Sequence, residues 1–227
     1  MTLVEKFYPV MKPWLFRLDA EKAHTFTVKM MVIAHRLGML KSVVDTPQSP
    51  RQVMGLTFPN VLGLAAGMDK SAGAVDAWGA LGFGFVEVGT LTPRPQPGNP
   101  KPRLFRLPEH EALINRMGFN NPGIQSAVKK LQRRKTKAVV GVNIGKNFDT
   151  PNEKAVDDYL ICLKAAYPVA NYIAVNISSP NTKGLRDLQA EDAVRQLIHA
   201  LKKEQVSLQK EHGKSVPLLV KIAPDLN

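Results

Sequence analysis

Two different patterns of apolar residues divide the chain near residue 45. Within residues 1–45, apolar side chains recur every three or four positions, which is the spacing of amphipathic helices. Pro9 and Pro13 are expected to break the first helix or to delay its start. Asp19 stands where it can cap a second helix. We therefore predict a helical extension over residues 1–45 and a separate domain over residues 46–227.

Beyond residue 55, short apolar runs alternate with longer amphipathic stretches. Apolar runs without polar alternation are typical of strands buried on both faces, and their alternation with helices predicts a parallel sheet with right-handed crossovers. The predicted strands are Val61–Ala66, Gly84–Gly89, Ala138–Asn143, Tyr172–Ile177 and Leu218–Ile222, and the predicted helices span residues 71–81, 121–135, 151–167 and 190–212.

Two α/β folds fit this alternation, a doubly wound sheet and a TIM barrel. The doubly wound nucleotide fold carries a glycine fingerprint after its first strand, and the segment Gly63–Lys70 does not match it. The Gly141–Asn147 segment resembles a phosphate loop but lacks the Ser or Thr. We therefore predict a TIM (β/α)8-type barrel. About the first five β/α units are present, so we expect residues 46–227 to be an incomplete barrel and the chain to be a fragment of a longer protein.

Composition and charge restrict the chemistry. A single cysteine, Cys162, excludes a disulfide framework and a multi-cysteine metal centre, and no metal site is predicted. No apolar run is long enough to span a bilayer. The net charge is +12, and residues 94–138 hold eleven Lys or Arg but only Glu109 and Glu111 as acids. Such a basic stretch either attracts anions or forms a soluble surface.

Polar residues gather directly after the predicted strands, at the edge where parallel sheets bind ligands. The loop Asn176–Thr182 offers amides and hydroxyls that could hold a planar ligand, although the same residues also favour ordinary turns. No histidine lies near Ser179 in the sequence, so a Ser–His nucleophile pair is unsupported. Lys70 and Lys221 need a counter-charge if they are buried, and Asp69 could supply it to Lys70 as a structural ion pair.

Seven motifs in order resemble the quinone-linked (class 2) dihydroorotate dehydrogenases, and the match runs from the helical start to residue 225. They are Gly63–Lys70, Val88–Asn99, Lys101–Arg106, Ile114–Asn121, Val142–Asn147, Asn176–Asn181 and Val220–Asp225. The helical extension also resembles the one that separates this class from the soluble class. The catalytic loop of the soluble class carries a cysteine. In this chain the position that resembles it is occupied by Ser179, which again resembles class 2.

The resemblance implies a flavin enzyme of pyrimidine biosynthesis that oxidises (S)-dihydroorotate to orotate, with FMN as cofactor and a membrane quinone as acceptor. Ser179 is implied as the catalytic base. The implied cofactor contacts are Ala66, Gly67, Met68, Asp69, Lys70, Thr90, Asn143, Asn176 and Lys221. The implied substrate contacts are Lys70, Asn115, Arg116, Met117, Gly118, Phe119, Asn176 and Asn181.

The resemblance also implies peripheral attachment to the cytoplasmic side of the cell membrane, where the helical extension would admit the quinone. No nucleic-acid partner is expected. Two alternatives remain open. The first is an FMN-dependent barrel that modifies RNA, similar to a tRNA-dihydrouridine synthase, with the basic stretch holding tRNA. The second is an inactive, membrane-associated fragment. The expected FMN phosphate site lies in strands beyond Asn227.

Overall fold

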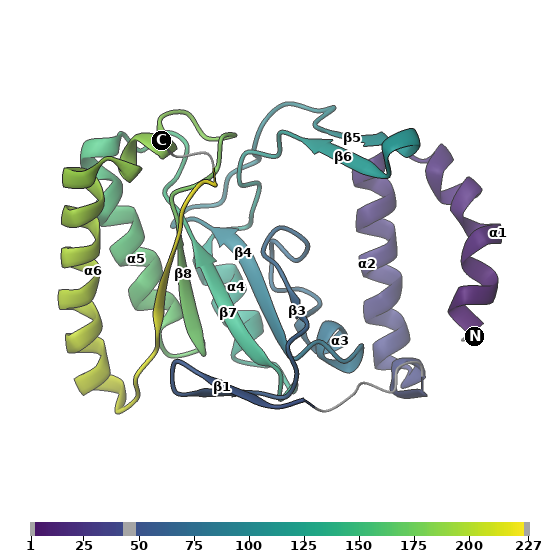
Figure 1. Cartoon of the computed structure of the whole chain (residues 1–227), viewed down its shortest axis with the longest axis horizontal. Helices are drawn as coiled ribbons and strands as arrows, with labels where there is room; N and C mark the ends of the chain where they lie inside the picture. The colour runs from purple at the N-terminus through teal and green to yellow at the C-terminus, as the bar shows by residue number, and fades with distance from the viewer. Residues whose placement is uncertain (1–2, 43–48, 225–227) are drawn as a thin grey trace.

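A computed structural model describes residues 3–42 and 49–224. The centre of the protein is a parallel sheet of five strands. The strands follow one another across the sheet in chain order (Figure 1). This sequential order is that of a barrel wall, because a doubly wound sheet reverses its order at a switch point. The barrel interpretation is therefore confirmed for these five units. The strands are β3 (Gly63–Leu64), β4 (Phe85–Leu91), β7 (Val139–Ile144), β8 (Tyr172–Asn176) and β9 (Leu218–Lys221).

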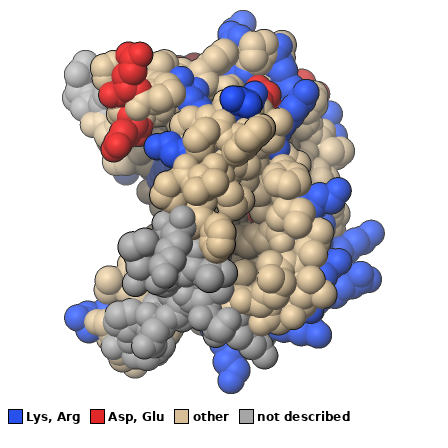
Figure 2. Space-filling view, turned by 90° about the vertical axis from the view of Figure 1, so that its right-hand side faces the viewer, with Lys and Arg blue, Asp and Glu red and all other residues tan. Residues whose placement is uncertain are grey.

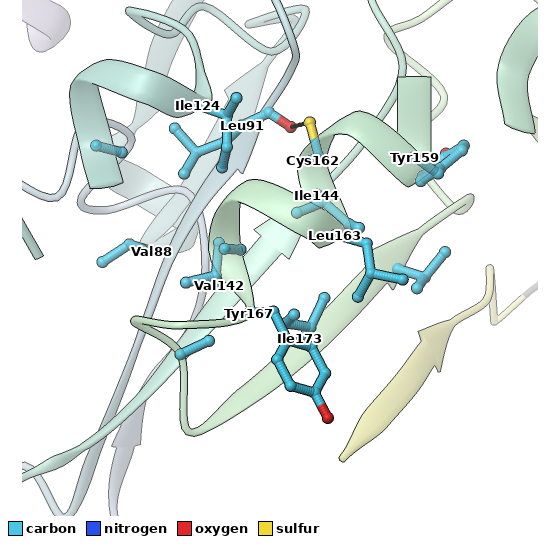
Figure 3. Close-up of a cluster of buried hydrophobic side chains, with 14 of the residues drawn as sticks. Val88, Leu91, Ile124, Val142, Ile144, Tyr159, Cys162, Leu163, Tyr167 and Ile173 are labelled. Carbon is cyan, nitrogen blue, oxygen red and sulfur yellow. Dashed lines mark hydrogen bonds between the residues drawn. The ribbon is translucent and has the colours of Figure 1, made fainter. Parts of the chain in front are cut away.

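Helices connect the strands and pack on one face of the sheet. They are α3 (Val75–Ala80), α4 (Ile124–Leu131), α5 (Ala155–Ala166) and α6 (Glu191–His212), with 3₁₀ turns at η1 (Met39–Ser42), η2 (Pro108–His110), η3 (Asn152–Lys154) and η4 (Leu185–Gln189). The main core lies between these helices and the sheet, and it includes Val88, Val142 and Ile173 of the strands and Tyr159 and Leu163 of α5 (Figure 3). The predicted strands and helices are confirmed, with bounds that differ by a few residues.

Two short hairpins were not predicted. One consists of β1 (Arg51–Val53) and β2 (Leu56–Phe58), joined by a turn with positive φ at both Met54 and Gly55. Such turns usually carry Asn or Asp at the first position. Because Met54 stands there instead, the sequence pattern did not predict this hairpin. The other consists of β5 (Leu104–Leu107), which is mostly half-buried, and β6 (Ala112–Asn115), which is exposed throughout, so neither carries a fully buried face.

The first hairpin supplies a plug for the inner face of the sheet. Phe58 packs in a second, smaller core with Val139, Tyr172 and Ala174. Its ring meets that of Phe85 edge to face, with centroids 5.5 Å apart. Alternate residues of the strands therefore serve two cores, one under the helices and one on the inner face.

The helical extension forms α1 (Leu3–Arg17) and α2 (Ala20–Arg36), which lie at one end of the molecule (Figure 1). The predicted break at Pro9 and Pro13 is wrong, because α1 continues through both. The helix is largely exposed, so water can reach the carbonyls that the prolines leave without a partner. Asp19 caps α2 as predicted, accepting from the Lys22 N–H at 3.0 Å. Residues 43–48, where the extension was expected to end, lie outside the described residues.

Shortening a side chain in the main core should destabilise the fold far more than the same change on the surface of the same helix. Leu163 on α5 is fully buried, whereas Ile161 is 48% exposed. We expect Leu163→Ala to lower the free energy of unfolding by about 2 to 5 kcal/mol, and Ile161→Ala by less than about 1 kcal/mol. Urea unfolding measures both, and equal losses would contradict this assignment of the core.

Candidate active site

A cavity of about 1220 Å³ opens at the carboxyl edge of the sheet. Strand ends, the segment after β6, the loop after β8 and helix α2 all line it. Most residues that the sequence assigned to cofactor or substrate come together here, although they lie up to about 155 positions apart in the chain. They are Ala66, Gly67, Met68, Asp69, Lys70, Thr90, Asn115, Met117, Gly118, Phe119, Asn176, Ser179, Asn181 and Lys221.

Two predicted site residues do not line the cavity. The guanidinium of Arg116 donates to the Pro102 carbonyl at 2.9 and 3.3 Å and lies 5.9 Å from the Phe105 ring centre. The predicted contact of Arg116 with substrate therefore stays a prediction, and its side chain does not line the cavity. Asn143 is fully buried beneath the cavity wall, where it bonds to the lining residues Thr90 and Asn176.

Buried amides and hydroxyls form a connected network under the cavity. The Thr90 hydroxyl donates to Asn143 Oδ1 at 2.5 Å, and Asn176 Nδ2 donates to Thr90 Oγ1 at 2.9 Å. Asn176 Oδ1 then accepts from the backbone N–H and the hydroxyl of Ser178, at 3.2 and 3.0 Å. Because each buried polar group finds a partner, this part of the wall is rigid and mostly neutral.

Ser179 lies at the mouth of this network, in the loop that follows β8. Its hydroxyl oxygen accepts the backbone N–H of Asn181 at 3.2 Å. The Asn181 amide nitrogen in turn lies 3.4 Å from the Asn115 carbonyl oxygen. No histidine or carboxylate among the described residues bonds to the Ser179 hydroxyl. Any base catalysis at Ser179 must therefore gain its strength from the ligand and from the exclusion of water.

Lys70 projects into the cavity without the ion pair that the sequence permitted. The Asp69 carboxylate instead accepts the backbone N–H groups of Ser71, Gly73 and Ala74, at 3.3, 2.9 and 2.8 Å. Asp69 thus shapes the loop rather than neutralising Lys70. Burial lowers the pKa of the Lys70 ammonium, and the charge of Arg103 lowers it further. An anionic ligand would relieve both effects.

Helix α2 borders the same cavity through residues to which sequence analysis gave no role. Glu21, His24 and Val28 line it on the side opposite the strand ends. Burial lowers the pKa of His24, as does the charge of Lys70 to a lesser degree. The helical periodicity gave no signal for Glu21 and His24, because a polar residue on an amphipathic helix is normally exposed to solvent.

A buried ion pair joins α2 to the loop between β4 and β5. The Arg103 guanidinium donates to both oxygens of Glu21, at 3.0 and 2.7 Å, and to the carbonyls of Pro97 and Asn99, at 2.6 and 2.9 Å. The side chains of Arg103 and Glu21 are only 5% and 13% exposed. Asn99 then donates to the Arg116 carbonyl at 2.8 Å. The pair therefore positions α2 against the segment that carries the predicted substrate contacts.

Most of the basic residues between 94 and 138 are engaged within the protein. Arg94 pairs with Asp149 at 2.6 Å, and the Arg134 guanidinium donates to the Val169 carbonyl at 2.6 Å. Arg106 donates to the Leu18 carbonyl at 2.8 Å and lies over the Phe16 ring. Their charges hold loops and helices together, so the basic stretch is not one free anion-binding surface.

Among the residues in the described ranges, no group of histidine, cysteine, aspartate and glutamate side chains is arranged to hold a metal ion. None of the helices in those ranges combines the length and apolar character that crossing a bilayer requires.

Protonating Glu21 should release α2. Arg103 holds the pKa of the Glu21 carboxyl below its ordinary value, so the pair stabilises the fold fully above the pKa of the unfolded chain, about 4.3. That stabilisation disappears as the pH falls through the lower, folded-state pKa. At neutral pH, Glu21→Gln should cost about 3 kcal/mol, because it leaves Arg103 buried without its partner.

Unfolding measured by urea between pH 3 and pH 7 tests this prediction. Glu191→Gln is the matched control, since Glu191 pairs with Arg195 on the surface of α6, where both side chains are largely exposed. The control should cost less than about 1 kcal/mol. Equal losses for the two variants, or an unchanged acid dependence in Glu21→Gln, would contradict the prediction.

Comparison with known proteins gives one consistent result. The family profile described as Dihydroorotate dehydrogenase matches residues 50–227. The chain is 59% identical over 221 residues to a protein of Methylobacillus flagellatus named Dihydroorotate dehydrogenase (quinone), and 58% identical to a protein of the same name from Chromobacterium violaceum. These alignments cover 97% of this chain but only 66% and 64% of the relatives, so the chain spans slightly less than two thirds of their length.

Solved structures agree with the sequence comparison. The structure of the DHODH of Eimeria tenella in complex with ferulenol matches with a TM-score of 0.78 and 41% sequence identity, covering 89% of this chain and 60% of that one. The ligand-free structure of the same protein matches equally well, at 43% identity.

Proposed function

The chain belongs to the dihydroorotate dehydrogenase family, and from this premise we propose that it takes part in oxidising (S)-dihydroorotate to orotate, with electrons passing to a quinone. The reaction is a step of pyrimidine biosynthesis. The quinone acceptor is supported by the names of the relatives from Methylobacillus flagellatus and Chromobacterium violaceum.

One observation carries the proposal: the strand ends and α2 line the same cavity. Ser179 and Asn181 come from the loop after β8, whereas His24 and Val28 come from the helical extension. A substrate at the strand ends and a second, apolar reactant beside α2 could therefore meet one cofactor from two sides. The cavity is also large enough for a flavin together with a small substrate.

The residues present fit a flavin, for which we propose FMN. The turn at Gly67, with φ of +112°, lets the backbone approach a flat ligand without a side chain in between. Thr90 and Asn176 would contact the ring system, and Lys221 supplies a cation at the end of β9 that favours an anionic reduced ring. When bound, a flavin would supply the hydride acceptor for C6 of dihydroorotate and the electrons that a quinone takes up.

The neutral amides suit a pyrimidine substrate. Asn115, Asn176 and Asn181 offer donors and acceptors to ring amide groups, and Lys70 would meet the carboxylate. Ser179 would receive the C5 proton. Serine is a weak base, but this proton lies next to a carbonyl group, which lowers the cost of its removal. The loop after β8 would close over the substrate and exclude water.

We further propose that the helical extension docks on the cytoplasmic side of the cell membrane and admits the quinone there. Large apolar side chains remain exposed on both helices, among them Phe7, Met11 and Trp14 on α1 and Phe26 and Met30 on α2. Lys and Arg side chains stand around this end of the molecule (Figure 2). An apolar face with basic margins is typical of peripheral binding to anionic lipid.

Nothing at the site favours the RNA-modifying alternative, and we propose no nucleic-acid partner. Arg103 is buried against Glu21, and Arg94 and Arg134 have partners within the chain. An RNA-binding groove would instead leave such side chains free for phosphates.

Replacing Ser179 should slow the reduction of the flavin without weakening the binding of the flavin. In the protein at its full native length, we expect Ser179→Ala to keep its flavin but to be reduced by dihydroorotate at least about a hundredfold more slowly, because the base is lost. Anaerobic stopped-flow absorbance of the flavin measures this rate. Ser207→Ala, on the exposed face of α6, is the control and should behave as wild type. An unchanged rate in Ser179→Ala would exclude Ser179 as the base.

Membrane docking can be tested through Trp14, whose side chain is 67% exposed. Loss of one large apolar side chain from a lipid interface removes about 2 kcal/mol, so Trp14→Ser should weaken partitioning into phosphatidylglycerol vesicles at least about fivefold. Vesicle flotation measures the partitioning, and Ile161→Ser on α5 is the control. Equal partitioning of Trp14→Ser and wild type would contradict docking through α1.

A further inference from the structure

An acidic side chain lies on the inner face of the sheet, below the proposed flavin site, and the proposed reaction gives it no role. It belongs to Glu87 of β4. The register of the sheet aligns Glu87 with Gly141 of β7, and Gly141 with Tyr172 of β8. These three residues therefore form one row across three neighbouring strands, on the face that carries the Phe58 core.

Because Gly141 has no side chain, the side chains of Glu87 and Tyr172 can contact each other across β7. A Cβ atom at Gly141 would lie 2.1 Å from Cζ and 2.5 Å from the hydroxyl oxygen of Tyr172. The Tyr172 ring therefore crosses β7 over the bare glycine, and its hydroxyl donates to Glu87 Oε2 at 3.0 Å. Burial raises the pKa of Tyr172, and the neighbouring Glu87 raises it further, so the hydroxyl keeps its proton and acts as the donor.

The other carboxylate oxygen determines which way the Asn143 amide points. Glu87 Oε1 accepts from Asn143 Nδ2 at 2.8 Å. An ionised carboxylate has only acceptors, so the nitrogen of the amide must face Glu87 and the oxygen must face away. In the opposite orientation, two acceptors would be in contact inside the protein, which is costly at low local dielectric.

The orientation of the Asn143 amide in turn determines how Thr90 and Asn176, which line the cavity, form their hydrogen bonds. Asn143 Oδ1 accepts from the Thr90 hydroxyl and from Asn176 Nδ2, at 2.5 and 3.2 Å. The Thr90 oxygen therefore remains an acceptor, and the Asn176 oxygen faces Ser178. A chain of donors thus points from the loop of Ser179 down to the charge of Glu87.

We propose that Glu87, fixed by Tyr172 across Gly141, is a positioning residue that sets the donor and acceptor pattern presented to the flavin. The inference rests on the proposed function, because it assigns Thr90 and Asn176 to the cofactor. Glu87 acts through Asn143 and touches neither cofactor nor substrate. Without that acceptor, Asn143 Nδ2 is left buried without a partner and only the bonds to Thr90 and Asn176 hold the amide, so the wall presents its pattern to the ring less firmly.

The test compares three variants in the protein at its full native length. Glu87→Leu keeps the approximate volume but removes the acceptor, and it should weaken flavin binding at least about tenfold. Glu87→Gln retains an oxygen for Asn143 and should restore binding to within about threefold of wild type. Tyr167→Phe is the control, because Tyr167 is a buried tyrosine that bonds to the Lys214 carbonyl in the other core.

Flavin fluorescence titration gives the affinity, and the visible spectrum and midpoint potential of the bound flavin report on its surroundings. A purely structural role for Glu87 would lower the melting temperature of Glu87→Leu but leave affinity, spectrum and potential unchanged, which would overturn the inference. Loss of affinity that Glu87→Gln does not restore would also overturn it. Tyr167→Phe should alter the melting temperature alone.

If Glu87→Leu does not fold, Tyr172→Phe takes its place, since it keeps the carboxylate but removes the bond that fixes it. We expect a weaker affinity and a shifted spectrum, and a wild-type result for both would overturn the inference. A wild-type protein that binds no flavin would refute the proposed function and this inference together. Flavin binding that is equal in wild type and Glu87→Leu would refute the inference alone.

Discussion

The structure depends on one constraint: the polar side chains of Thr90, Asn143 and Asn176, buried at the carboxyl edge of the sheet, are satisfied by one another and by Glu87. Parallel strands in sequential order bring these three side chains together. Each amide or hydroxyl therefore has one acceptable orientation, given the charge of Glu87 at the end of the chain of donors. A wall built in this way is ordered before any ligand arrives, which is what binding a flat, polar ring requires.

The helical extension is attached to that edge mainly through one buried ion pair. Helix α2 has few buried side chains of its own, so apolar packing alone holds it weakly against the domain. The pair between Glu21 and Arg103 supplies a specific contact, and Arg103 also holds the carbonyls of Pro97 and Asn99. The same guanidinium thus joins a helix suited to an apolar partner and a loop next to the proposed substrate site. The cavity is shared between the two as a consequence.

Sequence analysis predicted the sheet, its helices and most of the site, because these follow from strong local patterns and ordered motifs. Apolar runs without alternation located β4, β7 and β8, and Asp19 marked the start of α2. The failures have physical causes. Helix α1 tolerates Pro9 and Pro13 because the carbonyls that they leave without a partner can face water. The turn between β1 and β2 was missed because Met54 occupies a position where Asn or Asp is usual. Arg116 stays a predicted substrate contact, although its guanidinium bonds to the Pro102 carbonyl and does not line the cavity. The roles of Glu21, Glu87 and Tyr172 arise only from contacts between distant strands and helices, which no local pattern reveals.

The central claim is that one cavity brings together a flavin, a pyrimidine and a quinone. Anaerobic titration of the full-length protein, loaded with FMN, tests it most directly. The account predicts that dihydroorotate bleaches the visible absorbance of the flavin and that a short-chain quinone, added afterwards without oxygen, restores it. A flavin that dihydroorotate leaves oxidised, or a reduced flavin that the quinone cannot reoxidise, would contradict the claim.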